Sequence, residues 1–273
     1  MTMTLTITKA HAYGNDFLFV HRDDVDGRDT AALSRRLCAR HTGIGGDGLI
    51  LYSFTPGGAT MRLINADGSP SELSGNGLRC LAALVIRDRE RRGGGPDGVS
   101  TGVVAKTDAG ERRLSLTARG DGRYMFTAAM GQPTDLAQET LEVAGESLVV
   151  ATLGIGNPQC VALMASLPDR ERFNRLGPAL STHARFPAGT NVEFAVVEAP
   201  SRVRILIWER GVGPTEASGT GACAAAITAM QFGGAAHDVE VVAPGGTQRV
   251  EWRADGVHLT GWAEILFDAT WMP

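Results

Sequence analysis

Residues 74–80 read SGNGLRC and residues 218–223 read SGTGAC, so the chain contains two serine-led, glycine-rich loops of one pattern. When the sequence is shifted by 144 residues, identical residues coincide in and before the two loops: Pro70 with Pro214, Glu72 with Glu216, Ser74 with Ser218, Gly75 with Gly219 and Gly77 with Gly221. Five identities in register favour an internal duplication over a chance likeness of two glycine-rich loops.

The sequence around each loop repeats as well. A strand pattern precedes each loop, at residues 61–65 (MRLIN) and 203–208 (VRILIW), and a helical pattern follows, beginning at Leu78 and Ala222. Short strands with glycine turns are expected after each helix. This order predicts an α+β fold with two pseudo-symmetric halves, each a mostly antiparallel sheet wrapped around a central helix, with the active site in the cleft between them.

The expected halves are residues 1–118, with a C-terminal strand at 263–273 packing back on them, and residues 119–262. A chain of 273 residues, 43% of them apolar and 21% charged, is long enough to bury a core without disulfides or metal. The net charge of −4 and the lack of a basic patch with interleaved aromatics argue against a nucleic-acid partner.

No apolar run approaches the length of a membrane span, and MTMTLTITKA reads as a strand, not as a signal peptide. The four cysteines form no CxxC pair and no ligand spacing for zinc, so we expect a cytoplasmic protein without a metal site. A homodimer is the commonest assembly among soluble oligomers and is the expectation here.

The two loops predict an anion site. A glycine-rich loop that enters a helix leaves backbone N–H groups without partners, and the helix dipole adds partial positive charge there. Two such loops are suited to hold one carboxylate from two sides. The alternative for each serine is a plain helix N-cap, a role in which serine is favoured.

Other polar residues at strand ends and loops suit a small zwitterion such as an amino acid, although each alone has an alternative role in a turn or cap. They are Asn15 in GND, the glycine-dense loop at 40–48 (RHTGIGGDG), Asn157 in GIGNPQC, Asn191 in GTNVEF, and Glu209 with Arg210 after an apolar strand.

Taken together, these motifs resemble the diaminopimelate epimerase family over nearly the whole chain. The resemblance is carried by GNDF at 14–17, RHTGIGGDG at 40–48, NADGS at 65–69, GNGLRC at 75–80, GNPQC at 156–160, GTNVEF at 189–194, and WERGVGPT with GTGAC from 208 to 223. It implies two pseudo-symmetric halves, no cofactor, and the interconversion of LL- and meso-diaminopimelate on the route to lysine and peptidoglycan.

The family uses two cysteines, one before each loop, as the acid and the base that invert the α-carbon. This sequence departs from that pattern, because Ser74 and Ser218 stand at both positions and Gln159 replaces a histidine. A hydroxyl is a far weaker acid than a thiol, so we expect impaired proton transfer. Glu72 and Glu216, each two residues before a serine, are candidate proton acceptors, with solvent-facing or capping roles as the alternative.

The resemblance implies that Ser74 and Ser218 occupy the catalytic positions. It places the substrate-binding residues at Asn15, Asn65, Gly75, Asn76, Asn157, Asn191, Glu209, Arg210, Gly219 and Thr220. Two alternatives stay open: a non-catalytic diamino-acid-binding homologue, and a one-base isomerase on the same scaffold. Cys80 and Cys223 are expected to be small buried residues of the two helices.

Overall fold

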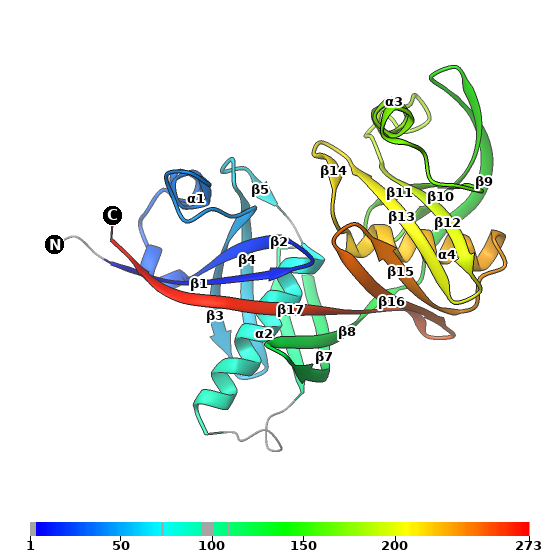
Figure 1. The fold of residues 1–273 in the computed structure, drawn as a ribbon. Coiled ribbons are helices and arrows are strands. Elements are labelled where there is room, and N and C mark those ends of the chain that lie inside the picture. The colour runs from blue at the N-terminus through cyan, green and yellow to red at the C-terminus, as the bar shows by residue number, and fades with distance from the viewer. Residues whose placement is uncertain (1–3, 72–73, 94–100, 109, 273) are drawn as a thin grey trace. The chain divides into compact units, whose positions relative to one another are not determined.

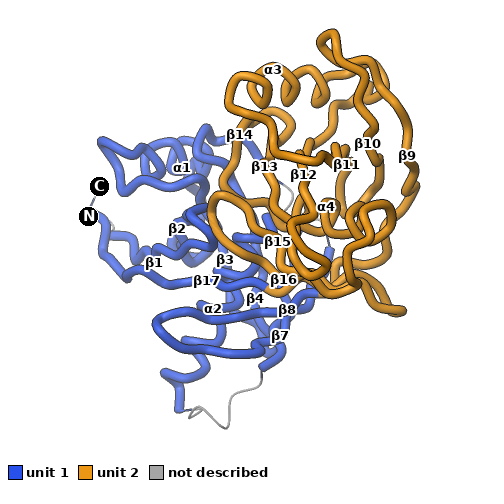
Figure 2. The backbone as a smooth tube through the Cα atoms, turned by 45° about the vertical axis from the view of Figure 1, so that its right-hand side comes forward, with its two compact units in different colours: residues 1–128, 261–273 blue, residues 129–260 orange. Residues whose placement is uncertain are grey.

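The computed structural model describes residues 4–71, 74–93, 101–108 and 110–272, and the chain forms two compact units. Unit 1 comprises Met1–Ala128 and Gly261–Pro273, and unit 2 comprises Ala129–Thr260 (Figure 2). The chain passes from one unit to the other inside two strands, β8 (Arg123–Gly131) and β17 (Gly256–Trp271). The halves expected from the sequence, divided after residues 118 and 262, stay a prediction.

Unit 1 is built on strands that are mostly antiparallel (Figure 1). Besides parts of β8 and β17, its strands are β1 (Leu5–Ala12), β2 (Asn15–His21), β3 (Gly48–Thr55), β4 (Gly58–Asn65), β5 (Pro70–Ser71), β6 (Gly102–Thr107) and β7 (Gly110–Gly120). A short 3-10 helix, η1 (Arg22–Val25), follows β2. Among the strand pairs described in unit 1, β2–β3 and β4–β6 are parallel. A parallel connection needs a crossover, and the two are made by helices α1 (Thr30–Cys38) and α2 (Gly75–Arg91).

Unit 2 repeats this plan after an additional strand, β9 (Thr134–Val143). Its other strands are β10 (Glu146–Gly154), β11 (Pro158–Leu163), β12 (Asn191–Ala199), β13 (Arg202–Glu209), β14 (Gly213–Thr215), β15 (Asp238–Ala243) and β16 (Gly246–Arg253). The parallel pairs are β11–β12 and β13–β15. Helices α3 (Arg170–Ser181) and α4 (Gly219–Phe232) make the two crossovers.

The pairing order confirms the predicted duplication. The antiparallel pair β1–β2 corresponds to β10–β11, and β7–β8 corresponds to β16–β17. In both units the second parallel crossover contains the serine-led loop and the helix that follows it. The chain therefore has the expected α+β fold with two similar halves.

Helices α2 and α4 are buried because their sequences are apolar where they meet the sheets. The sequence of α4, GTGACAAAITAMQF, is almost entirely apolar or small, and its residues from Ala222 to Ile227, with Ala229, lie in one core cluster with β13, β15 and β16. In α2 the buried residues run to Ile86, and the arginines of its last turns follow. As expected, Cys80 and Cys223 are fully buried.

Within the described ranges, no helix is both long and apolar enough to cross a membrane.

Candidate active site

Both serines are helix N-caps. Ser74 Oγ accepts a hydrogen bond of 3.1 Å from the backbone N–H of Gly77, and Ser218 Oγ accepts one of 3.2 Å from that of Gly221. The helices therefore begin at Gly75 and Gly219, three residues earlier than the helical pattern suggests. At each N-terminus the first backbone N–H groups have no partner inside the helix, which makes the start of α2 and of α4 suited to an anion.

In unit 1 the structure brings Asn15 and Asn76 together. Asn76 donates from its side-chain amide to Asn15 Oδ1 at 3.2 Å, and its own Oδ1 accepts from the guanidinium of Arg79 at 2.5 Å. Arg79 is almost completely buried and lies over the ring of Tyr13. The amide of Asn15 donates to Asp47 Oδ2 at 2.7 Å. A continuous chain of side-chain hydrogen bonds thus fixes the orientation of both amides.

Asp47 is a site residue that the sequence reasoning did not single out. Its carboxylate accepts from Asn15 and from the backbone N–H of Asp16, and it pairs with Arg40 at 2.7 Å. Arg40 also pairs with Asp16 at 2.9 Å, as does Lys9 at 2.9 Å. The hydrogen bonds and charges from Arg40 and Lys9 outweigh burial and hold the pKa of Asp16 below its usual value. The position of Asp47 in the motif RHTGIGGDG was the sequence signal that could have identified it.

Asn65 uses its side-chain amide differently, donating to Ser69 Oγ at 2.9 Å. No hydrogen bond from Asn65 to Asn15, Asn76 or Ser74 is present among the described residues. Glu72, the proton acceptor suggested for Ser74, lies outside the described residues.

In unit 2 the carboxyl group of Glu209 is half-buried and lies near the hydroxyl of Ser218. Burial raises the pKa of Glu209, and the Ser218 hydroxyl opposes this rise. Because capping uses the oxygen of Ser218 as an acceptor, its O–H proton can still donate to a further group. Glu216, the acceptor suggested by the sequence, is exposed on the loop.

The amides of unit 2 are held in two groups. Asn191 Oδ1 accepts from the backbone N–H of Arg210 at 2.9 Å, and the exposed guanidinium of Arg210 donates to the carbonyl of Ala188 at 2.8 Å. Asn157 Oδ1 accepts from the side-chain amide of Gln159 at 2.6 Å. Thr220 lies 3.5 Å from Ser218, oxygen to oxygen. Of the predicted binding residues of unit 2, Thr220 thus lies beside Ser218 at the start of α4, and Asn191 contacts Arg210.

A second residue missed from the sequence is Glu193, on β12. It is completely buried, and an added Cβ on Gly221 would lie 2.5 Å from its Oε1. Burial, reinforced by the charge of Glu209, raises the pKa of Glu193 well above its ordinary value. The motif GTNVEF contains this residue, but a lone glutamate in a strand gives no signal of burial.

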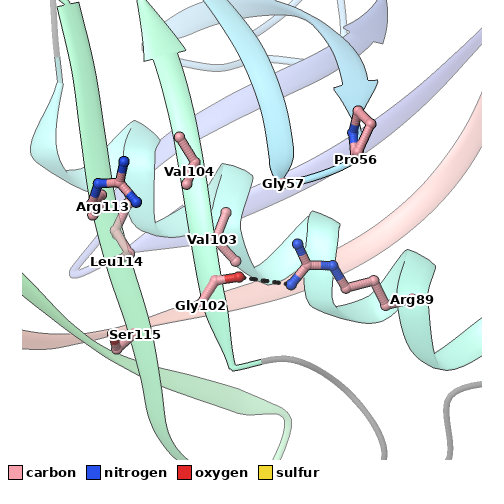
Figure 3. A pocket seen from close by; sticks show the side chains of 9 residues that line it. All are labelled: Pro56, Gly57, Arg89, Gly102, Val103, Val104, Arg113, Leu114 and Ser115. Atoms are coloured by element: carbon pink, nitrogen blue, oxygen red, sulfur yellow. Dashed lines mark hydrogen bonds between the residues drawn. The ribbon is translucent and has the colours of Figure 1, made fainter.

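Two pockets differ in their relation to these residues. In unit 2 a pocket of about 550 Å³ is lined by Asn157 and Gln159, with Thr152, Arg185 and Thr190 also on its wall. In unit 1 a pocket of about 420 Å³ lies over β6, where Arg89 donates to the carbonyl of Gly102 (Figure 3). None of the predicted site residues lines the pocket of unit 1.

Comparison with known proteins gives one consistent result. The family model described as diaminopimelate epimerase matches residues 7–134 and 151–266. The diaminopimelate epimerase of Desulforudis audaxviator is 39% identical over 293 aligned positions, covering 98% of this chain and 99% of the relative.

Solved structures share the fold at low identity. A predicted epimerase from Pseudomonas aeruginosa superposes with a TM-score of 0.71 at 14% identity, covering 98% of this chain and 99% of that one. A hydroxyproline epimerase from Agrobacterium vitis, solved with trans-4-hydroxy-L-proline, superposes with a TM-score of 0.69 at 16% identity, covering 98% of this chain and 92% of that one.

Proposed function

Because the chain belongs to the diaminopimelate epimerase family, we propose that it interconverts LL- and meso-diaminopimelate by two-base proton transfer. The family consists of cofactor-independent amino-acid epimerases, and the chain is an enzyme of this racemase and epimerase type. In the proposal Ser74 and Ser218 occupy the two acid/base positions that cysteines hold in the family.

The position of Glu209 near the hydroxyl of Ser218 carries this proposal. A serine hydroxyl is a poor base until another group takes its proton. In the proposed step the α-proton passes to the Ser218 oxygen while the hydroxyl proton passes to the Glu209 carboxylate. A carboxyl group whose pKa is raised by burial is a better proton acceptor than one in water. Glu209 therefore has a role beyond holding the substrate.

The proposed substrate-binding groups are side-chain amides and backbone N–H groups. The N–H groups of Gly75 and Asn76 at the start of α2, and those of Gly219 and Thr220 at the start of α4, each suit a carboxylate on which charge develops as the α-carbon loses its proton. The guanidinium of Arg210 receives the distal carboxylate. The remaining polar contacts come from Asn15, Asn65, Asn157 and Asn191.

Proton NMR of LL- and meso-diaminopimelate with the protein in heavy water tests the proposal. Loss of the α-proton signal, with either isomer converting to the mixture, is the expected result. Binding without loss of that signal would contradict the catalytic proposal, and neither binding nor exchange would remove diaminopimelate as the ligand. A Ser74→Ala/Ser218→Ala double variant, which lacks both proposed acid/base hydroxyls, serves as the negative control for α-proton exchange.

A non-catalytic diamino-acid-binding protein is the second candidate. It is favoured by the capping bonds, because both serines already have a structural role at the start of α2 and α4. A one-base isomerase on the same scaffold is disfavoured by the retention of both serine-led loops and of Glu209 with Arg210.

A further inference from the structure

Gln159 stands where the family pattern has a histidine, and its side chain is almost completely buried between three polar groups. One end of its carboxamide lies 3.1 and 3.2 Å from the two carboxyl oxygens of Glu193. The other end lies 2.6 Å from Asn157 Oδ1 and 3.1 Å from Thr220 Oγ1. Gln159 therefore connects a buried carboxyl group to two residues in the proposed substrate-binding set.

These distances allow two hydrogen-bond patterns. In the first, the Gln159 nitrogen donates to an ionised Glu193 and its oxygen faces Asn157. In the second, a protonated Glu193 donates to the Gln159 oxygen, and the Gln159 nitrogen donates to Asn157 Oδ1. In the two patterns, donor and acceptor are exchanged in each hydrogen bond between Glu193, Gln159 and Asn157.

The surroundings of Glu193 favour the second pattern. No ion pair to Glu193 is present in the part of the chain that the structure describes, and an isolated ionised carboxylate is very costly to bury. Among the described residues, the charge that acts on Glu193 is that of Glu209 at the end of β13, and Cys160 on β11 is a buried neighbour. Arg185 lines the pocket beside Gln159 and acts on Cys160. The first turn of α4, GTGA, has no titratable group. Burial and the charge of Glu209 both raise the pKa of Glu193.

The two patterns also differ at Asn157. In the first, the Gln159 oxygen faces Asn157 at 2.6 Å, so Asn157 must turn its NH2 group toward Gln159. In the second pattern both ends of the Gln159 amide have suitable partners. Asn157 Oδ1 then accepts from Gln159, so the NH2 group of Asn157 is left to donate elsewhere.

We propose that Glu193 and Gln159 form a positioning pair that makes Asn157 a hydrogen-bond donor to a carboxylate of the substrate. The proposal rests on the proposed function for the identity of that substrate. Protonated Glu193 fixes the direction of the Gln159 amide, and Gln159 fixes that of Asn157. If Glu193 ionises, the Gln159 amide turns over, Asn157 must present its oxygen instead, and a carboxylate is repelled.

Two measurements on the full chain test the pair. The first needs no ligand: the Glu193 carboxyl carbon and the side-chain amides of Gln159 and Asn157 are followed by NMR as pH is raised. The pKa of Glu193 is expected to lie above the ordinary value of about 4.3, with both amide signals moving when Glu193 titrates. An ordinary pKa for Glu193, or amide signals that do not change during its titration, would overturn the pair.

The second measurement is the affinity for diaminopimelate as a function of pH, by calorimetry. Wild-type affinity should fall over the pH range in which Glu193 ionises. Glu193→Gln keeps a neutral donor to Gln159, so its affinity for diaminopimelate should stay constant over this pH range. Gln159→Leu removes the hydrogen bonds that link Glu193 to Asn157. It should weaken diaminopimelate binding about tenfold, the loss of one oriented hydrogen bond. Equal pH dependence in wild type and Glu193→Gln would overturn the positioning role.

Glu240→Gln is the matched control, since Glu240 is a surface carboxylate of unit 2 paired with Arg202. It should change neither the amide signals nor the affinity. A wild-type protein that shows the coupled titration but does not bind diaminopimelate would refute the proposed function while leaving the hydrogen-bond pair supported.

Discussion

Asn65 and Glu209 stand at equivalent positions of the duplication, nine residues before Ser74 and Ser218, but their side chains have different partners. Asn65 donates to Ser69, whereas Glu209 lies near the hydroxyl of Ser218, which affects its pKa. An amide cannot accept a proton at neutral pH and a carboxylate can. The two proposed acid/base positions are therefore chemically unequal, although the folds around them are alike.

This inequality predicts that Glu209→Gln slows α-proton exchange by about 10²–10⁴-fold, the usual contribution of a positioned general base. The exchange rate of diaminopimelate in heavy water is the measurement. Glu216→Gln, which removes an exposed carboxylate from the same loop, should leave the rate unchanged. Equal losses in the two variants would remove Glu209 from the proton-transfer step.

Restoring thiols should raise the exchange rate. A cysteine has a pKa of about 8.5, and a helix N-terminus lowers it further. The Ser74→Cys/Ser218→Cys double variant should therefore exchange the α-proton faster than wild type by orders of magnitude. No gain would mean that the residues around the loops have diverged from epimerase chemistry. Thiol titration of the variant checks that both cysteines ionise.

The capping role of each serine can be measured separately from catalysis. Ser74→Ala and Ser218→Ala should each lower the free energy of unfolding by about 0.5–2 kcal/mol, since each removes an N-cap. Ser→Asn at the same positions keeps a cap without a hydroxyl and should be close to wild type. Urea denaturation followed by circular dichroism gives these values, and an Ala variant as stable as wild type would refute the cap.

The close packing of Gly221 against Glu193 predicts a difference between the two loops. A Cβ on Gly221 would lie 2.5 Å from Glu193 Oε1, whereas a Cβ on Gly75 would meet no atom within 4 Å. Gly221→Ala should therefore destabilise the protein by about 1–3 kcal/mol, the usual cost of overpacking. Gly75→Ala should be neutral or stabilising by up to about 1 kcal/mol, since alanine is the better helix former. Thermal and urea unfolding compare the two, and equal effects would contradict the packing.

The buried Glu193 also makes stability depend on pH. The pKa of Glu193 is raised in the folded state. Its contribution to the free energy of unfolding is therefore fully present below the unfolded-state pKa of about 4.3, and it is lost as pH rises through the folded-state pKa. Relative to Glu193→Gln, wild type should therefore lose up to about 1.4 kcal/mol per pH unit across that window. Unfolding free energies of both proteins from pH 4 to 8 test this, and parallel curves would show that Glu193 is ionised in the fold.

The duplication and the presence of both central helices were predictable because their signals are local. A serine followed by small residues and an apolar helical pattern marks an N-cap within a few positions, and the structure confirms Ser74 and Ser218 as caps. The strand patterns before the loops likewise correspond to β4 and β13. Their registers and partners could not be read from the sequence, because pairing depends on residues far apart in the chain.

Helix α3 and the burial of Glu193 could not be predicted from the sequence, for physical reasons. Helix α3 contains Gly177 and Pro178, which disfavour a helix locally, but Phe173, Leu176 and Leu180 pack it into a core. Glu193 alternates with Val192 and Phe194, which suggests an outward-facing residue. Both faces of this sheet are covered, however: Val192 and Phe194 lie in the core with α3, and Ala195 lies in the core with α4. The intervening glutamate is therefore buried as well.

The last strand gives unit 1 a dependence on residues far along the chain. Strand β17 ends at Trp271 and pairs with β1 from Leu5 onward, whereas unit 2 is one continuous segment inserted between the two parts of unit 1. A form of the protein in which β17 is displaced would expose the backbone groups along one edge of β1. An exposed strand edge can pair with another chain, so displacement of β17 would favour association between copies.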